Sequence, residues 1–229
     1  MTERTTLSHD LAAQERGHDV NASDRDFADL GLPEDLLAAV TDLGFASPTA
    51  VQASAIPLLL EGRDVVGVAQ TGTGKTAAFA LPLLAHIDAD APRVQALVLT
   101  PTRELAMQGA EAVESFASRS RGLDVVAVYG GSPYGPQLRA LEHGAQVVVG
   151  TPGRIMDLMD RGALLLDAVR YFVLDEADEM LRMGFADDVE TIASDLPAER
   201  ISALFSATMP PAIRRVAERH LRDPEEVTI

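Results

Sequence analysis

The sequence contains no cysteine and no tryptophan, and only one of its 229 residues is a lysine. The lack of cysteine excludes structural disulfides and thiolate-bound metal in this chain and leaves the redox compartment open. The five histidines show no HxxxH or HxH spacing, so we expect no protein-bound zinc. A formal net charge of −16 argues against a general electrostatic binder of nucleic acid. A local groove with a few arginines remains compatible with that charge.

Long apolar runs are also missing. No stretch reaches the length that spans a bilayer. The amino terminus has no basic segment followed by an apolar run, so it is not typical of a secretory signal. We therefore expect a cytoplasmic protein without a membrane partner. With 47% hydrophobic and 24% charged residues, the chain has the composition of a globular protein that can bury a full core.

The chain divides into a polar amino-terminal segment and a regular domain. Residues 1–26 have no sustained apolar period and are predicted to form a disordered tail. From Phe27 onward, apolar spacing predicts a helix that includes residues 36–43. Ser47-Pro48-Thr49 and Gly62 predict the start and end of a second helix over residues 50–60. Short apolar runs then alternate with helical segments. The runs are 64–68, 96–100, 125–129, 146–149, 171–174, 203–205 and 227–229.

Strands that are apolar throughout are typical of a parallel sheet covered by helices on both faces. Helical segments between them imply right-handed crossovers. The sequence therefore predicts one doubly wound α/β domain over residues 27–229. Ligands bind at the carboxyl ends of strands in such folds. The chemically suggestive loops of this chain mostly follow predicted strands, so we expect them to gather along one edge of the sheet.

Residues 69–76 read A-Q-T-G-T-G-K-T and depart from the usual phosphate-loop pattern only in the first letter. A predicted strand precedes this loop, and a predicted helix over residues 77–87 follows it. Lys75 is expected to bridge the β- and γ-phosphates, and the Thr76 hydroxyl to ligate Mg²⁺. The alternative is a turn that merely holds the only lysine, but arginine cannot replace a compact ammonium between two phosphates. The expected phosphate-binding residues are Thr71, Gly72, Thr73, Gly74, Lys75 and Thr76.

Two carboxylates follow the apolar run over residues 171–174. Asp175 is expected to hold the Mg²⁺ shell, partly through water. Glu176 can orient or deprotonate an attacking water. The alternative is an acidic first turn that stabilises the next helix through its dipole. Together with the phosphate loop, the two carboxylates favour catalysis by Lys75, Asp175 and Glu176.

Residues 175–178 spell D-E-A-D, and residues 27–229 resemble the first RecA-like lobe of a DEAD-box RNA helicase. Further stretches resemble the family's motifs and occur in the family's order. They are Gly44-Phe45, Pro48-Thr49 and Gln52, then 101–106, 130–131, 151–154 and 206–208. Residues 129–131 with 137–141, and residues 179–185, are similar to the bacterial cold-shock branch of this family, called DeaD.

The resemblance implies a role for each motif. Gln52 would read the adenine edge and Phe27 would stack on the base, so that ATP is preferred as the cofactor. The alternatives are an ordinary polar helix residue for Gln52 and a hydrophobic staple for Phe27. Sequence-independent RNA binding is expected through backbone contacts, although each fragment could instead be only a helix cap. The implied RNA-binding residues are Pro101, Thr102, Arg103, Gly131, Thr151, Gly153 and Arg154.

Ser206 and Thr208 would link the nucleotide site to RNA strand separation by bonding Asp178, or would merely satisfy a turn. Two other groups of residues have structural interpretations. Four arginines are expected on the solvated face of a late helix, namely Arg214, Arg215, Arg219 and Arg222. An apolar group is expected in the core, namely Met180, Leu181, Met183 and Phe185.

The family's second RecA-like lobe carries arginines in a segment resembling H-R-x-G-R-x-x-R, and this chain has no such segment. We therefore expect one lobe of a two-lobe motor, with the second lobe as its partner, that binds nucleotide but is nearly inactive alone. A non-catalytic RNA-binding or regulatory module remains an alternative. Another P-loop enzyme, such as a GTPase, is disfavoured because Lys75 as the only lysine excludes an N-K-x-D segment.

Overall fold

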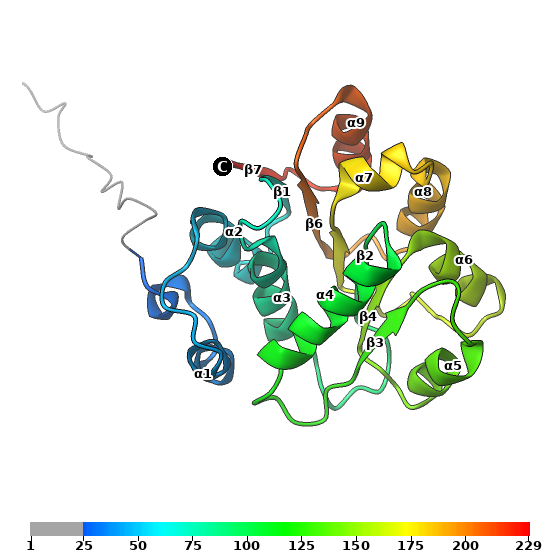
Figure 1. Ribbon diagram of the computed structural model, residues 1–229, viewed down its shortest axis with the longest axis horizontal. Coiled ribbons are helices and arrows are strands. Elements are labelled where there is room, and N and C mark those ends of the chain that lie inside the picture. The colour runs from blue at the N-terminus through cyan, green and yellow to red at the C-terminus, as the bar shows by residue number, and fades with distance from the viewer. Residues whose placement is uncertain (1–24) are drawn as a thin grey trace, which may run out of the picture.

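The computed structural model describes residues 25–229 (Figure 1). The tail predicted over residues 1–26 lies outside the described residues except for its last two positions. The described chain forms a seven-stranded sheet with the order β3-β4-β2-β5-β6-β1-β7, and each neighbouring pair runs parallel. The strands are β1 (Val65–Val68), β2 (Ala96–Leu99), β3 (Val125–Val128), β4 (Val147–Gly150), β5 (Tyr171–Leu174), β6 (Ile201–Ser206) and β7 (Glu225–Thr228).

Helices cover both faces of the sheet. They are the 3₁₀ helix η2 (Phe27–Leu30) and α1 (Glu34–Asp42), α2 (Ala50–Leu60), α3 (Lys75–Ala85), α4 (Arg103–Phe116), α5 (Tyr134–Glu142), α6 (Pro152–Asp160), α7 (Ala177–Arg182), α8 (Ala186–Ser194) and α9 (Pro211–His220). Figure 1 shows α1 to α4 on one side of the sheet and α6 to α9 on the other. Within residues 25–229, no helix is both long and apolar enough for a bilayer crossing.

Successive side chains of each strand point to opposite faces of the sheet, and this produces two separate hydrophobic cores. Tyr171 and Val173 of β5 pack with the helices on the α1–α4 side, whereas Phe172 and Leu174 pack with those on the α6–α9 side. All four side chains are at most 1% exposed. Burial of successive side chains on opposite faces explains why β5 is apolar throughout. The predicted doubly wound α/β fold is confirmed.

Some element bounds differ from those predicted, and the differences have local causes. Helix α3 begins at Lys75 instead of residue 77, because Gly74 turns the chain into the helix with a φ of 89°. Strand β7 begins at Glu225, before the predicted apolar run. It pairs only with β1 at the edge of the sheet, so part of it is exposed and carries polar residues. A prediction from apolar runs therefore misses the polar residues of an edge strand.

Two structural predictions from the sequence were wrong. Met180 is buried in the core, but Met183 is 47% exposed because it lies at the carboxyl end of α7, where the chain turns into α8. Arg222 does not lie on the late helix, because α9 ends at His220.

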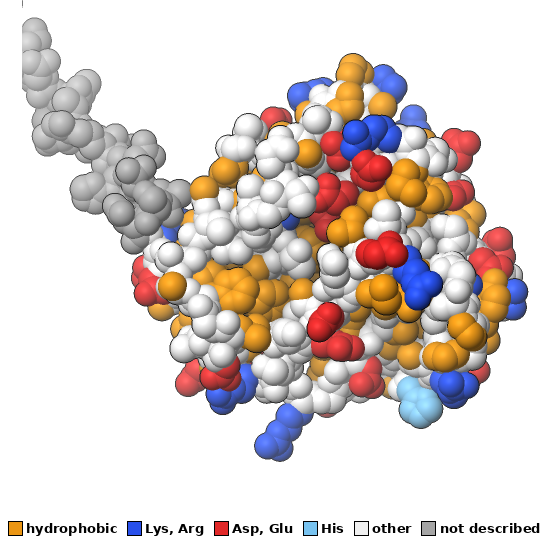
Figure 2. Space-filling model, in the orientation of Figure 1, with side chains coloured by type: hydrophobic (Ala, Val, Ile, Leu, Met, Phe, Trp, Pro, Cys, Tyr) orange, Lys and Arg blue, Asp and Glu red, His pale blue; other side chains and the backbone are white. Residues whose placement is uncertain are grey.

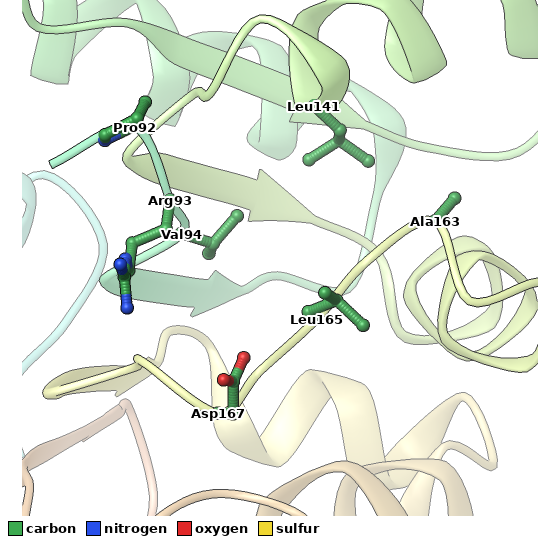
Figure 3. A pocket seen from close by; sticks show the side chains of 7 residues that line it. All are labelled: Pro92, Arg93, Val94, Leu141, Ala163, Leu165 and Asp167. Carbon is green, nitrogen blue, oxygen red and sulfur yellow. The ribbon is translucent and has the colours of Figure 1, made fainter.

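A cavity of about 220 Å³ opens at the amino edge of the sheet (Figure 3). Val94 precedes β2, Leu141 precedes β4 and Leu165 precedes β5, so the lining residues come from the starts of strands. The sequence motifs follow the strands and therefore lie at the opposite edge. Arg93 and Asp167 are the charged residues that line the cavity, which contains no part of the phosphate loop.

Candidate functional site

The order of the strands divides the predicted site into two halves (Figure 1). Strands β1, β6 and β5 are neighbours, so the phosphate loop after β1 lies beside residues 206–208 and residues 175–178. Strands β2, β4 and β3 are also neighbours, so the predicted RNA-binding motifs that follow them form the second half. The topology alone therefore separates the nucleotide residues from the RNA residues along one edge.

The phosphate loop requires glycine at the end that leads into α3. Gly74 has a φ of 89°, and a Cβ atom built there would lie 2.4 Å from Nε2 of Gln52. Any other residue would clash with Gln52 and strain the backbone. Thr73 steadies the loop, because its hydroxyl donates to the carbonyl of Gln70 at 2.7 Å. Lys75 and Thr76 then occupy the first turn of α3, at the positive end of the helix dipole.

Lys75 forms an ion pair with Glu176 across the nucleotide half. The distance between Lys75 Nζ and Glu176 Oε1 is 2.8 Å, and the two side chains are 6% and 15% exposed. Glu176 has a φ of 54° and a ψ of 48°, an uncommon conformation for a residue other than glycine. Strain of this kind persists only where the surrounding structure imposes it, and it is typical of functional positions.

Asp175 has the chemical character of a cation ligand. Its Oδ1 atom is the one buried side-chain nitrogen or oxygen without a hydrogen-bond partner among residues 25–229. Burial raises the pKa of Asp175 to about 7, although the Lys75 ammonium opposes the rise. In the described part of the chain, no three His, Cys, Asp or Glu side chains come together as a metal cage. The residues therefore fit a Mg²⁺ that depends on nucleotide phosphates for its remaining ligands.

The contact predicted between Asp178 and the residues Ser206 and Thr208 is present. The Thr208 hydroxyl donates to Asp178 Oδ2 at 2.8 Å, and the backbone N–H of Asp178 donates to the Ser206 hydroxyl at 3.3 Å. Burial alone would raise the pKa of Asp178, but the hydrogen bonds from Thr208, Ser206 and the Glu179 backbone lower it below the ordinary value. Asp178 is thus held as an anion that joins α7 to the β6–α9 loop.

Gln52 is buried, and both polar atoms of its amide are bonded within the protein. Its Oε1 accepts from the Thr49 backbone at 3.0 Å and its Nε2 donates to the carbonyl of Gly74 at 3.1 Å. These bonds form a capping box at α2 and tie α2 to the phosphate loop. Recognition of adenine by Gln52 stays a prediction, and it would require these bonds to rearrange.

Phe27 is only 2% exposed. Its ring packs edge-on against Phe45 with centroids 6.1 Å apart, and Phe45 in turn packs on Phe116 of α4. Phe27 therefore packs inside the protein, as expected if it serves a hydrophobic contact and does not stack on a base. Stacking of Phe27 on a base stays a prediction, because it requires a ring face that the described conformation buries.

The RNA half combines helix caps with exposed backbone. The Thr102 hydroxyl caps α4 by accepting from the Leu105 N–H at 3.2 Å, so the cap interpretation holds for Thr102. Pro101 before it is buried. Arg103 is exposed, with its guanidinium carbon 5.1 Å from the centre of the Tyr129 ring. Figure 2 shows acidic and basic side chains interspersed on one face of the molecule, without a continuous basic surface.

The loops after β3 and β4 leave room for a ligand at the backbone. Gly131 has a φ of 78°, and no atom lies within 4 Å of a Cβ built at Gly131 or Gly153. Thr151 is half-buried at the start of α6, and its side chain makes no cap hydrogen bond there. These open positions fit the predicted close approach of a nucleic-acid backbone.

Arg154 is placed differently from the other predicted RNA contacts. Its guanidinium donates to Gln137 Oε1 and to the Ser132 carbonyl, each at 3.1 Å, and the residue is 8% exposed. It stacks on Tyr134, which sequence reasoning had not selected as a site residue. Arg161 stacks on the same ring. No motif marks Tyr134 or Arg161, and the available signal was the four-residue spacing of Asp157 and Arg161 on a helix.

Residues 49–216 match the DEAD/DEAH box helicase family. The chain is 61% identical over 203 residues to the ATP-dependent RNA helicase DeaD of Haemophilus influenzae, which covers 89% of this chain and 33% of that protein. It is 58% identical over 207 residues to the protein of the same name from Mycobacterium tuberculosis, covering 90% of this chain and 37% of the relative. The chain therefore spans about a third of the length of these relatives. The resemblance to the DeaD branch is confirmed.

Solved structures show the same architecture. A DEAD box protein from the hyperthermophile Methanococcus jannaschii superposes with a TM-score of 0.85 at 44% identity, covering 89% of this chain and 55% of that one. A hypothetical ATP-dependent RNA helicase from Sulfolobus tokodaii superposes with a TM-score of 0.79 at 39% identity, covering 86% and 57%.

Proposed function

Because this chain belongs to the DEAD/DEAH box helicase family, we propose that it is the ATP-binding lobe of an ATP-dependent RNA helicase that couples ATP hydrolysis to local unwinding of RNA duplexes. The observation that carries the proposal is the position of Lys75 2.8 Å from Glu176, next to the buried and unpaired oxygen of Asp175. A cation on a phosphate-type loop and two carboxylates after β5, which β6 separates from β1 in the sheet, are the parts that phosphoryl transfer requires. The proposed location is the cytoplasm.

Each residue of the nucleotide half has a proposed task. The backbone N–H groups of residues 71–75 and the Lys75 ammonium bind the phosphates. Glu176 orients the attacking water and accepts its proton, a role open to it once Lys75 turns to the phosphate. Thr76 and Asp175 would hold Mg²⁺, which when bound neutralises charge that develops on the phosphate oxygens. Gln52 and Phe27 are proposed to select adenine.

The RNA half is proposed to bind single-stranded RNA without reading its sequence, through the residues after β2, β3 and β4. Asp178, Ser206 and Thr208 are proposed to link the nucleotide site to RNA strand separation, because their hydrogen bonds join the helix after β5 to the end of β6 beside the phosphate loop. The transition state needs further positive charge at the γ-phosphate, which we assign to a second RecA-like lobe. The chain alone is therefore proposed to bind nucleotide weakly and to hydrolyse it negligibly.

The single lysine allows a direct test of nucleotide binding. Biosynthetic labelling with ¹³C-lysine gives one side-chain signal set in an NMR spectrum, because Lys75 is the only lysine. We expect Mg-ATP to shift this signal and GTP at equal concentration to shift it less. Glu176→Gln removes the carboxylate partner of Lys75, so its spectrum shows the lysine signal in the absence of the ion pair.

A lysine signal that responds to Glu176→Gln but not to saturating Mg-ATP would contradict nucleotide binding at this loop. That result would favour a non-catalytic module with the same fold. RNA-stimulated ATP turnover at the rate of a complete helicase, without an added second lobe, would contradict the proposed inactivity of the chain alone.

A further inference from the structure

Two of the three tyrosines of the chain flank the Gly130–Gly131 turn, and both hold arginine side chains. Tyr129 lies against Arg103. Tyr134 lies against two arginines, because the guanidinium carbons of Arg154 and Arg161 are each 4.0 Å from the centre of its ring. An aromatic face attracts a guanidinium electrostatically, and the planar groups stack well. The rings therefore set the positions of arginines beside the proposed RNA-binding turn.

Arg154 uses its contacts to hold the protein together. Its two hydrogen bonds join α6 to Gln137 of α5 and to Ser132 in the loop before α5. With 8% of its surface exposed, its guanidinium has little access to a ligand. A cation that neutralises an RNA phosphate must be reachable from solvent. Arg154 is thus better suited to shaping this part of the surface than to charging it.

Arg161 has the opposite properties. It caps the carboxyl end of α6, and its side chain is 51% exposed. In the described part of the chain its ion-pair partner is Asp157, with 3.3 Å between Nε and Oδ1. An exposed pair of this kind contributes little to stability, so a phosphate can compete for the guanidinium. Stacking on Tyr134 occupies a face of the guanidinium and leaves its in-plane N–H donors available.

Asp157 connects the members of this cluster. It accepts the hydroxyl hydrogen bond of Tyr134 as well as the bond from Arg161. The Tyr134 bond, followed by the bond from Arg161, lowers the pKa of Asp157, so the carboxylate is an anion at neutral pH. The carboxylate accepts from the Nε–H of Arg161, so this donor is occupied, and its negative charge repels a phosphate.

We propose that Arg161 is a further RNA-phosphate contact, that Tyr134 positions it, and that Asp157 restrains it until RNA is bound. The inference rests on the proposed function, because it requires RNA along the edge formed by the loops after β3 and β4. It extends the RNA surface from the first turn of α6 to the end of that helix. The contact involves phosphate only, so it adds affinity without sequence preference.

The test measures binding of a short fluorescent oligouridylate by anisotropy over a KCl series, with Mg²⁺ and a non-hydrolysable ATP analogue. We expect Arg161→Gln to weaken binding about three- to fivefold and to reduce the slope of log affinity against log salt by about 0.7. Arg119→Gln is the matched control. Arg119 is 54% exposed and paired with Asp42 at 2.6 Å, away from the proposed RNA edge, and its loss should change neither quantity.

Two further variants distinguish an RNA contact from a structural role. Asp157→Asn frees Arg161 and removes a negative charge, so RNA binding should become about two- to threefold tighter. Tyr134→Phe keeps the ring and should bind RNA within about twofold of the unmodified chain, whereas Tyr134→Leu should resemble Arg161→Gln. A purely structural cluster would instead show weaker binding in Asp157→Asn.

The outcomes distinguish failure of the Arg161 contact from failure of the proposed RNA function. If the unmodified chain binds the oligonucleotide and Arg161→Gln keeps its affinity and salt slope, the role of Arg161 is refuted and the proposed function stands. Weaker binding by Asp157→Asn would also refute the inference. If the unmodified chain binds no RNA with the nucleotide analogue, although the analogue itself binds, the proposed RNA function fails and this inference fails with it.

Discussion

The ammonium of Lys75 and the carboxylate of Glu176 lie 2.8 Å apart and join the phosphate loop to the acidic residues after β5. Both side chains are largely buried, so the pair is weakly screened by solvent. A phosphate bound to the loop must compete with Glu176 for Lys75. The strength of this ion pair therefore sets part of the affinity for nucleotide.

The first prediction separates the two members of the pair. Glu176→Gln removes the competitor, so it should bind Mg-ATP at least as tightly as the unmodified chain. Lys75→Ala should bind roughly tenfold or more weakly, because a charge-assisted contact to phosphate is lost. Calorimetric titration with Mg-ATP measures both. Glu179→Gln, which removes an exposed pair with Arg182, is the control and should change nothing. Equal weakening by Glu176→Gln and Lys75→Ala would contradict competition.

The second prediction concerns pH. Asp175 has a pKa of about 7 in the folded protein against 3.8 as its ordinary value. Between these values the folded protein holds a proton that the unfolded chain has released, so the contribution of Asp175 to stability falls as the pH rises. Asparagine has the same shape and cannot ionise.

Asp175→Asn should therefore be more stable than the unmodified chain at about pH 8, by the order of 1 kcal/mol or more, and nearly equal to it at about pH 4. Urea denaturation at a series of pH values measures the difference. The same variant should lose the Mg²⁺ dependence of ATP binding. A stability difference that does not change with pH would show that Asp175 ionises normally.

The third prediction divides the two bonds of Gln52. Gln52→Glu keeps an oxygen that accepts from Thr49 but loses the donor to Gly74. It should retain the helix cap and bind ATP more weakly. Gln52→Ala should lose the cap as well, which costs about 1–2 kcal/mol in the free energy of unfolding. Thermal denaturation and ATP titration together give the two effects. Unchanged ATP affinity in Gln52→Glu would exclude a role for the bond to Gly74.

The fourth prediction concerns Thr208. Thr208→Val removes the hydroxyl that bonds Asp178 and should cost about 1 kcal/mol at neutral pH. Because this bond lowers the pKa of Asp178, its stabilising effect exists where the carboxylate is charged and disappears as the pH falls through that pKa. Denaturation at neutral and strongly acidic pH measures this effect.

In a longer protein that contains both lobes, Thr208→Val should reduce duplex unwinding more than it reduces ATP hydrolysis. Thr191→Val is a suitable control, since the Thr191 hydroxyl bonds only the Asp187 carbonyl within α8. Parallel losses of unwinding and hydrolysis would contradict a coupling role for Thr208.

Sequence patterns predicted the elements whose environment is uniform. Strand β5 is buried on both faces, so its apolar run predicted Tyr171–Leu174 without error. Helix α2 was predicted as residues 50–60 because its start signal, Ser47-Pro48-Thr49, and its stop signal, Gly62, lie next to it in the sequence. Elements that are partly buried and partly exposed to solvent were less predictable. The edge strand β7 and the end of α7 at Met183 depend on neighbours that a local window does not contain.

The phosphate loop and the paired acids were predictable because each motif follows a strand, and the bond from Thr208 to Asp178 was implied by the family resemblance. The environments of Gln52, Phe27 and Arg154 were not. All three are polar or aromatic residues of recognisable motifs, yet the structure buries each against protein partners. Residue type shows which interactions a side chain can make, and packing decides which of them are already occupied.

The identity and order of the motifs, and hence the family, follow from the amino-acid sequence because they depend on residues adjacent in the chain. The pairing of Lys75 with Glu176 and the stacking of Arg154 and Arg161 on Tyr134 arise only in the folded molecule. The strand order brings together residues that lie far apart in the chain, as in that ion pair, whose members are 101 positions apart. Burial then decides which charges pair with each other and which remain accessible to a phosphate.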